Sequence, residues 1–139
     1  MPDNARIRVI LRWVQILDNK EPFYKERGEF FFRAVVKGDG TAQETRIPQE
    51  GQFEISDHPS WNKVNFDRVI FDGPVSGRLE IELLGEEVDT TSGNDQLELY
   101  RRTFTGEPSA WLGEHSPHDE DEDPENLADW RVCYRIERA

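Results

Sequence analysis

The chain has 139 residues and a net charge of −12, because 29 Asp and Glu residues outnumber 17 Lys and Arg residues. This length suffices for one domain with its own hydrophobic core, so a single domain is expected over residues 1–139. The acidic balance excludes nonspecific nucleic-acid binding, which depends on cationic side chains that displace counterions from phosphates. It is compatible with cation binding, or simply with solubility.

The apolar stretches, the N-terminal residues and the cysteine content indicate the cellular compartment. No apolar stretch approaches the roughly 20 residues of a transmembrane helix, and the first residues lack the basic and then apolar pattern of a secretory signal. The single cysteine, Cys133, excludes an intramolecular disulfide framework. These features predict a cytoplasmic protein that associates with a membrane, if at all, at its surface.

Short segments with alternating apolar residues follow one another along the chain, separated by Gly, Pro, Asn and Asp. In the first segment Ile7, Val9, Leu11 and Trp13 alternate with arginines, which predicts a strand with these four residues in the core. Seven further strands are predicted at 30–36, 43–47, 52–56, 65–71, 78–84, 96–104 and 130–136. Eight such strands without a long helical pattern indicate an all-β fold, an eight-stranded antiparallel β-sandwich whose end loops remain available for binding.

One stretch breaks this alternation. Residues 114–126 include the acidic run from Asp119 to Asp123 and contain no apolar side chain apart from proline. A segment of this composition has nothing to bury in a core. We therefore expect residues 114–126 to form an acidic, solvated loop or to be locally disordered.

The densest functional signal follows the predicted strand 78–84. Glu87, Asp89 and Asp95 lie in one short segment, E-V-D-T-T-S-G-N-D. Carboxylates crowded in a loop repel one another unless a cation lies between them, and calcium accepts about six to eight oxygen ligands in a flexible shell. The segment therefore suggests a calcium site, with a set of solvated acids as the alternative.

Three segments, in order along the chain, resemble the C2 domain family, the calcium- and phospholipid-binding β-sandwich. Glu87 to Asp95 resembles the third calcium loop of that family, an acid-x-acid pair followed by an Asn-Asp dipeptide. His58 to Asn62 resembles its Asn-Pro-x-Trp-Asn segment, and Asp18 with Gly28-Glu29 resembles its first calcium loop. The chain departs from the family pattern in using Glu where Asp is usual at positions 29 and 87, and its first loop is longer.

The resemblance implies a C2-like sandwich in which loops from one end hold calcium. The implied metal ligands are the carboxylates of Asp18, Glu29, Asp57, Glu87, Asp89 and Asp95. Loaded with calcium, the loops would bind a membrane phospholipid or an acidic protein partner. Phe23 and Tyr24, at the tip of the first loop, would enter the membrane interface or else fold back onto the end of the sandwich.

Two other binding interpretations remain open. The same sandwich could dock a protein partner without calcium, or bind carbohydrate through an exposed ring, for which Trp111 is the candidate. Catalysis is not expected, because Cys133 lies inside a regular strand and His115 and His118 lack the spacing and the cysteine neighbours of a metal site. The sequence thus predicts a binding protein rather than an enzyme.

Overall fold

The computed structural model describes residues 5–16, 27–38, 40–56, 63–88, 95–97, 99–115 and 130–139. These residues form ten strands and one short 3₁₀ helix: β1 (Ala5–Ile16), β2 (Arg27–Lys37), β3 (Ala42–Ile47), β4 (Phe53–Ser56), β5 (Lys63–Val75), β6 (Arg78–Glu87), β7 (Asp95–Gln96), β8 (Tyr100–Thr105), η1 (Pro108–Trp111), β9 (Gly113–His115) and β10 (Trp130–Arg138). Within this described part of the chain, no helix is long and apolar enough to cross a membrane.

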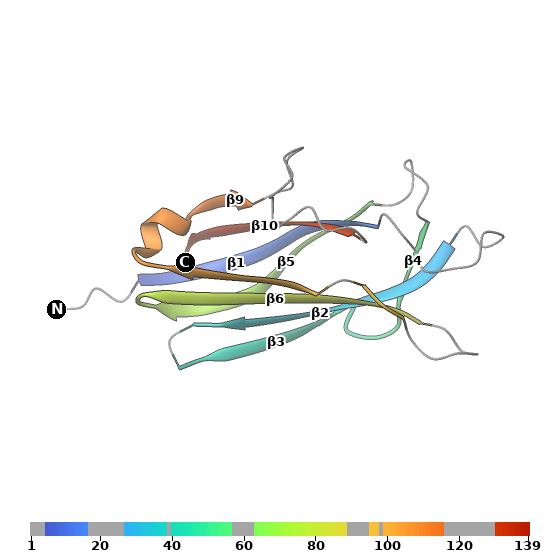
Figure 1. The fold of residues 1–139 in the computed structure, drawn as a ribbon, viewed down its shortest axis with the longest axis horizontal. Helices are drawn as coiled ribbons and strands as arrows, with labels where there is room; N and C mark the ends of the chain where they lie inside the picture. Colours follow the sequence, from blue (N-terminus) through green and yellow to red (C-terminus); the bar gives the residue numbers. More distant parts are fainter. Residues whose placement is uncertain are drawn as a thin grey trace.

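The strands form two antiparallel sheets packed face to face. Sheet A has the strand order β5-β1-β10-β9, and sheet B has the order β3-β2-β6-β7, with β4 also on β2 and β8 also on β6. Figure 1 shows β9, β10 and β1 in one layer and β6, β2 and β3 in the other. The predicted all-β class, with two antiparallel sheets forming a sandwich, is confirmed.

On each side of sheet B, two short strands pair with one long strand in place of a single continuous neighbour. β3 pairs with residues 32–37 of β2, and β4 pairs with residues 27–30 of the same strand. The interruption, at 48–52, contains Pro48, which has no N–H to donate, and Gly51, whose φ of 79° favours glycine. In the same way, β8 pairs with residues 78–83 of β6, and β7 pairs with residues 86–87 of that strand.

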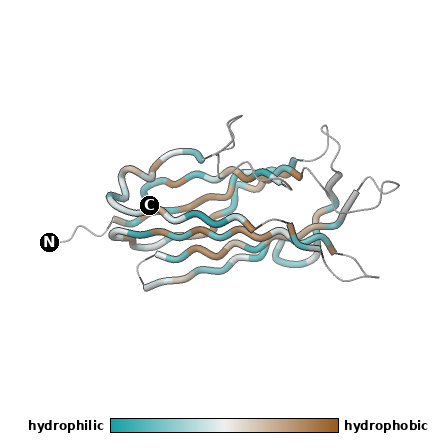
Figure 2. The backbone as a smooth tube through the Cα atoms, in the orientation of Figure 1, coloured by the Kyte–Doolittle hydropathy of each residue, from teal (hydrophilic) through white to brown (hydrophobic). Residues whose placement is uncertain are grey.

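The hydrophobic core lies between the sheets and takes its side chains from alternate positions of each strand. In β6 every second residue is buried from Leu79 to Glu87, and the residues between them are half-buried. Figure 2 shows the corresponding alternation of hydrophobic and hydrophilic positions along the strands. The period of two in the sequence thus gives each sheet one buried face.

Phe32 of β2 is the centre of an aromatic cluster that joins the two sheets. Its ring stacks on Trp130 of β10 at 5.6 Å between centroids and meets Phe66 of β5 edge-on at 5.8 Å. Within sheet B it lies 6.4 Å from both Phe30 and Phe53. Aromatic pairs at these separations stabilise a core beyond the area they bury.

Trp13 is not a core residue, contrary to the sequence prediction. The pairing of β1 with both neighbouring strands shifts between Leu11 and Trp13, so a β-bulge interrupts the alternation there. Val14 takes the buried position instead, while Trp13 lies half-buried on the outer face with Lys63 Nζ 4.3 Å from its ring centroid. A single inserted residue thus reverses the faces of the side chains that follow it.

The prediction of a solvated loop at 114–126 is wrong at its beginning. Glu114 and His115 belong to β9, which pairs with β10 at the edge of sheet A. A strand of three residues is too short to show a period of two, so the sequence gives no signal for it. Residues 116–126 lie outside the described part of the chain.

Candidate functional site

The strands that flank the predicted acidic loops have their ends at one pole of the sandwich. The first residue of β2 lies opposite the last residue of β4, and the last residue of β6 lies opposite the first residue of β7. In sheet A the first residue of β5 lies opposite the penultimate residue of β1. Figure 1 shows these strand ends together at the right of the view.

Glu87, the last residue of β6, has a fully buried side chain. It lies opposite Phe30, which is also fully buried, so both residues face the space between the sheets. Among the described residues it is the one charged side chain in the buried class. Burying a carboxylate is costly, so a nearby positive charge is favoured at this position.

The register of sheet B sets Asp95 directly opposite Glu87 on the neighbouring strand. Two acidic positions of the predicted third loop therefore meet across the β6–β7 pair. They are separated by seven residues in the sequence, of which the structure describes only Val88.

Glu29 is another of the predicted ligands, and it belongs to β2. It precedes the buried Phe30 on β2, is exposed, and lies opposite Glu54 of β4. Its main chain is near the end of β6, because Val88 N donates to Glu29 O at 2.7 Å. The side chains of Glu29 and Glu87 nevertheless occupy opposite faces of sheet B, since successive residues of a strand alternate between faces.

The remaining predicted site residues lie outside the described part of the chain: Asp18, Phe23, Tyr24, Asp57 and Asp89. In the sequence Asp57 directly follows β4, and Asp89 comes two residues after β6. Among the residues that are described, no three His, Cys, Asp or Glu side chains gather closely enough to hold a metal ion.

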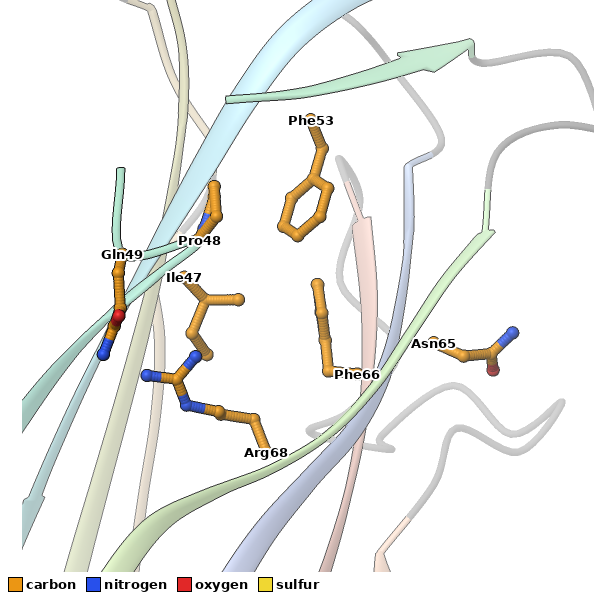
Figure 3. A pocket seen from close by; sticks show the side chains of 7 residues that line it. All are labelled: Ile47, Pro48, Gln49, Phe53, Asn65, Phe66 and Arg68. Carbon is orange, nitrogen blue, oxygen red and sulfur yellow. The ribbon is translucent and has the colours of Figure 1, made fainter. Parts of the chain in front are cut away.

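A second candidate site, which the sequence did not indicate, lies between the open edges of the two sheets. It is a pocket of about 310 Å³. Its lining comes from the β3–β4 region of sheet B and from β5 of sheet A (Figure 3): Ile47, Pro48, Gln49, Phe53, Asn65, Phe66 and Arg68. No local motif could reveal it, because the fold brings together segments that are distant in the sequence.

Comparison with known proteins does not assign the chain to a family. It matches no protein-family model, and no curated protein gives a significant match. The function therefore has to be argued from this chain's own residues and their geometry.

Trp111 is unsuitable as the exposed platform of a carbohydrate site. Its side chain is only 3% exposed, and its Nε1 donates to Thr105 O at 3.0 Å. The ring also packs against Phe104, with the centroids 6.2 Å apart. The proline-led turn η1 places Trp111 against the core, so its role is structural.

Cys133 is a buried thiol at the pairing of β10 with β9. Its Sγ donates to the Glu114 carboxylate at 3.1 Å. Burial, and then this hydrogen bond, raise the pKa of Cys133 to about 12. The side chain is therefore a protonated thiol at neutral pH, and only the thiolate is strongly nucleophilic.

His115 gives the fold a specific pH dependence. Its ring lies between Phe104 and Tyr134, at 5.0 and 5.2 Å between centroids, and its Nε2 is 2.8 Å from Trp111 O. Because a carbonyl oxygen only accepts, Nε2 carries the hydrogen. Burial lowers the pKa of His115 below 6.5; the bond to Trp111 opposes this shift and the Arg102 charge adds to it.

We expect the free energy of unfolding to fall as the pH drops below about 6.5, where an unfolded histidine binds a proton and the folded one does not. The loss should level off below the folded-state pKa. Urea unfolding at pH 7.5, 6.5 and 5.5 would measure it. His115→Phe should show a weaker decline than the unmodified protein, because other groups titrate in both; parallel profiles would contradict the assignment.

Proposed function

We propose that this protein is a calcium-dependent binding module that contacts a membrane phospholipid or a protein partner through acidic loops at one end of the sandwich. One observation carries the proposal: Asp95 lies opposite the buried Glu87 where the strands flanking these loops end. Carboxylate oxygens are the ligands that calcium prefers, and carbonyls and water complete its shell. A cation there would also compensate acidic residues that the register brings close together.

The arrangement of strands supports a C2-like identity for this module. If β3 with β4, and β7 with β8, are each counted as one interrupted strand, each sheet has four strands. The total of eight equals the number predicted from the alternating segments, although that prediction counted 43–47 and 52–56 as two strands and did not include β9. The proposed site then lies at the end where loops of both sheets emerge.

The proposed ligand set is smaller than the one that the sequence suggests. Glu29 is assigned to the solvated outer face of sheet B, because its side chain points away from the side that Glu87 faces. The proposed ligands are therefore Asp18, Asp57, Glu87, Asp89 and Asp95. Phe23 and Tyr24 are the proposed membrane-contacting residues, and a lipid headgroup would complete the calcium shell.

Calcium is expected to raise the melting temperature of the protein. Binding only to the folded state at about 100 times Kd adds about 2.7 kcal/mol to the free energy of unfolding, which corresponds to several degrees for a domain of this size. Scanning calorimetry with and without millimolar calcium would measure the rise. The double variant Asp89→Asn, Asp95→Asn should lose it.

The matched control is Glu29→Gln, which removes one negative charge from the opposite face and should keep the calcium response. If calcium leaves the melting temperature of the unmodified protein unchanged, the metal proposal fails and a calcium-independent interaction module takes its place. If calcium does raise the melting temperature, sedimentation with phosphatidylserine vesicles shows whether the calcium-loaded protein binds a lipid or a protein partner. Calcium-dependent pelleting that Phe23→Ala, Tyr24→Ala abolishes would identify the lipid.

A further inference from the structure

We infer that the pocket between the edges of the two sheets binds a small organic carboxylate with an aromatic or short aliphatic body. The inference is independent of calcium. It rests on three features of the described residues: an apolar wall, a guanidinium on the core side of an edge strand, and an opening between the sheets.

The apolar wall comes from both sheets. Phe53 of β4 and Phe66 of β5 lie 5.3 Å apart between ring centroids with their planes tilted by 49°. Both rings are only partly buried, and Ile47 and Pro48 extend the apolar surface beside them. Figure 3 shows the two rings and Ile47 facing a common space. Partly exposed rings and aliphatic carbons offer contact area to the body of a ligand.

Arg68 supplies the charge. In the register of sheet A it lies opposite Leu11, a core residue, so it occupies the core-facing side of β5. It is half-buried, and among the described residues no acidic side chain forms an ion pair with it. The arginines of β1 differ, because Arg6 and Arg8 pair with Asp72 and Arg12 pairs with Asp67. Among the described residues, no carboxylate therefore neutralises the charge of Arg68.

The remaining lining residues and the volume restrict the ligand. Gln49 and Asn65 are the other polar residues at the pocket, and none of the described lining residues is acidic. Its volume of about 310 Å³ is at the lower end of the range of roughly 300–1,000 Å³ for small-molecule pockets. A guanidinium holds a carboxylate through two parallel hydrogen bonds. A compact acid can satisfy Arg68 and cover the exposed rings together.

Binding can be measured by NMR titration of the full chain with phenylacetate, in EGTA to exclude calcium. We expect amide shifts confined to residues 47–53 and 65–68, and weaker binding of the neutral analogue phenylacetamide. Arg68→Gln should weaken phenylacetate binding by about tenfold or more, the usual effect of losing hydrogen bonds to a charged group. The control Arg101→Gln makes the same charge change on β8 and should not alter binding.

Reversing the charge of residue 68 together with the charge of the ligand tests the contact between them directly. Arg68→Glu should lose phenylacetate and gain binding of phenethylamine, because the same body then carries the opposite charge. Equal affinity for phenylacetate and phenylacetamide, shifts that map elsewhere, or full binding by a folded Arg68→Gln variant would each overturn the inference. Absence of any phenylacetate binding would do so as well. None of these results bears on the calcium proposal, since calcium is excluded.

Discussion

Replacing Phe32 with alanine is expected to lower the free energy of unfolding by about 3–5 kcal/mol, the usual cost of deleting a buried aromatic ring. Phe32 is 2% exposed and contacts rings from both sheets, among them Trp130 and Phe66. Its removal leaves a cavity between the sheets that these rigid neighbours cannot fill. Equilibrium unfolding in urea, monitored by tryptophan fluorescence, would measure the loss.

The adjacent Phe31 provides the matched control. It points to the outer face of sheet B, where the guanidinium of Arg46 lies 4.2 Å from its ring centroid. Phe31→Ala should cost less than Phe32→Ala, because the flexible arginine can move over the vacated space. Equal losses for the two variants would show that the cluster around Phe32 does not join the sheets.

Replacing Gly85 with alanine is expected to destabilise the protein by about 1–3 kcal/mol, the usual cost of overpacking a core. Gly85 lies opposite Phe32 in the β2–β6 pair. A Cβ at this position would lie 2.5 Å from Leu97 Cδ1 and 3.2 Å from two ring carbons of Phe32. The space above Gly85 is thus already filled by its neighbours, and urea unfolding would report the strain.

Two comparisons isolate this effect. Gly77→Ala should be nearly neutral, because a Cβ there would meet no atom within 4 Å and the residue does not have a positive φ. In a Leu97→Ala background, Gly85→Ala should cost less, since the closest contact is gone and neighbouring mutations couple. An additive double mutant, or a Gly85→Ala variant as stable as Gly77→Ala, would contradict the packing explanation.

The strands could be predicted because alternating burial leaves a direct trace in the sequence. That trace fails where the pairing changes: the bulge between Leu11 and Trp13 turns the tryptophan outward, although the alternation up to it is regular. It also fails for β9, whose three residues are strand only because β10 lies beside them. Both features depend on a partner strand, which a local pattern does not contain.

The candidate site was also predictable only in part. The sequence showed that acids gather after β6, and the register then sets Asp95 opposite Glu87. The outward position of Glu29 follows from the alternation of side chains along a strand, because the next residue, Phe30, is buried. The pocket beside Arg68 had no such signal, since its two walls meet only when the sheets pack together.

The break between β3 and β4 also affects how molecules of this protein meet one another. An uninterrupted edge strand displays a row of free N–H and C=O groups on which another chain can pair, and such pairing leads to aggregation. Here the outer edge of sheet B offers only six residues of β3 and four of β4, with Pro48 and the turn at Gly51 between them. The break therefore limits the length over which another chain could pair with this edge of sheet B.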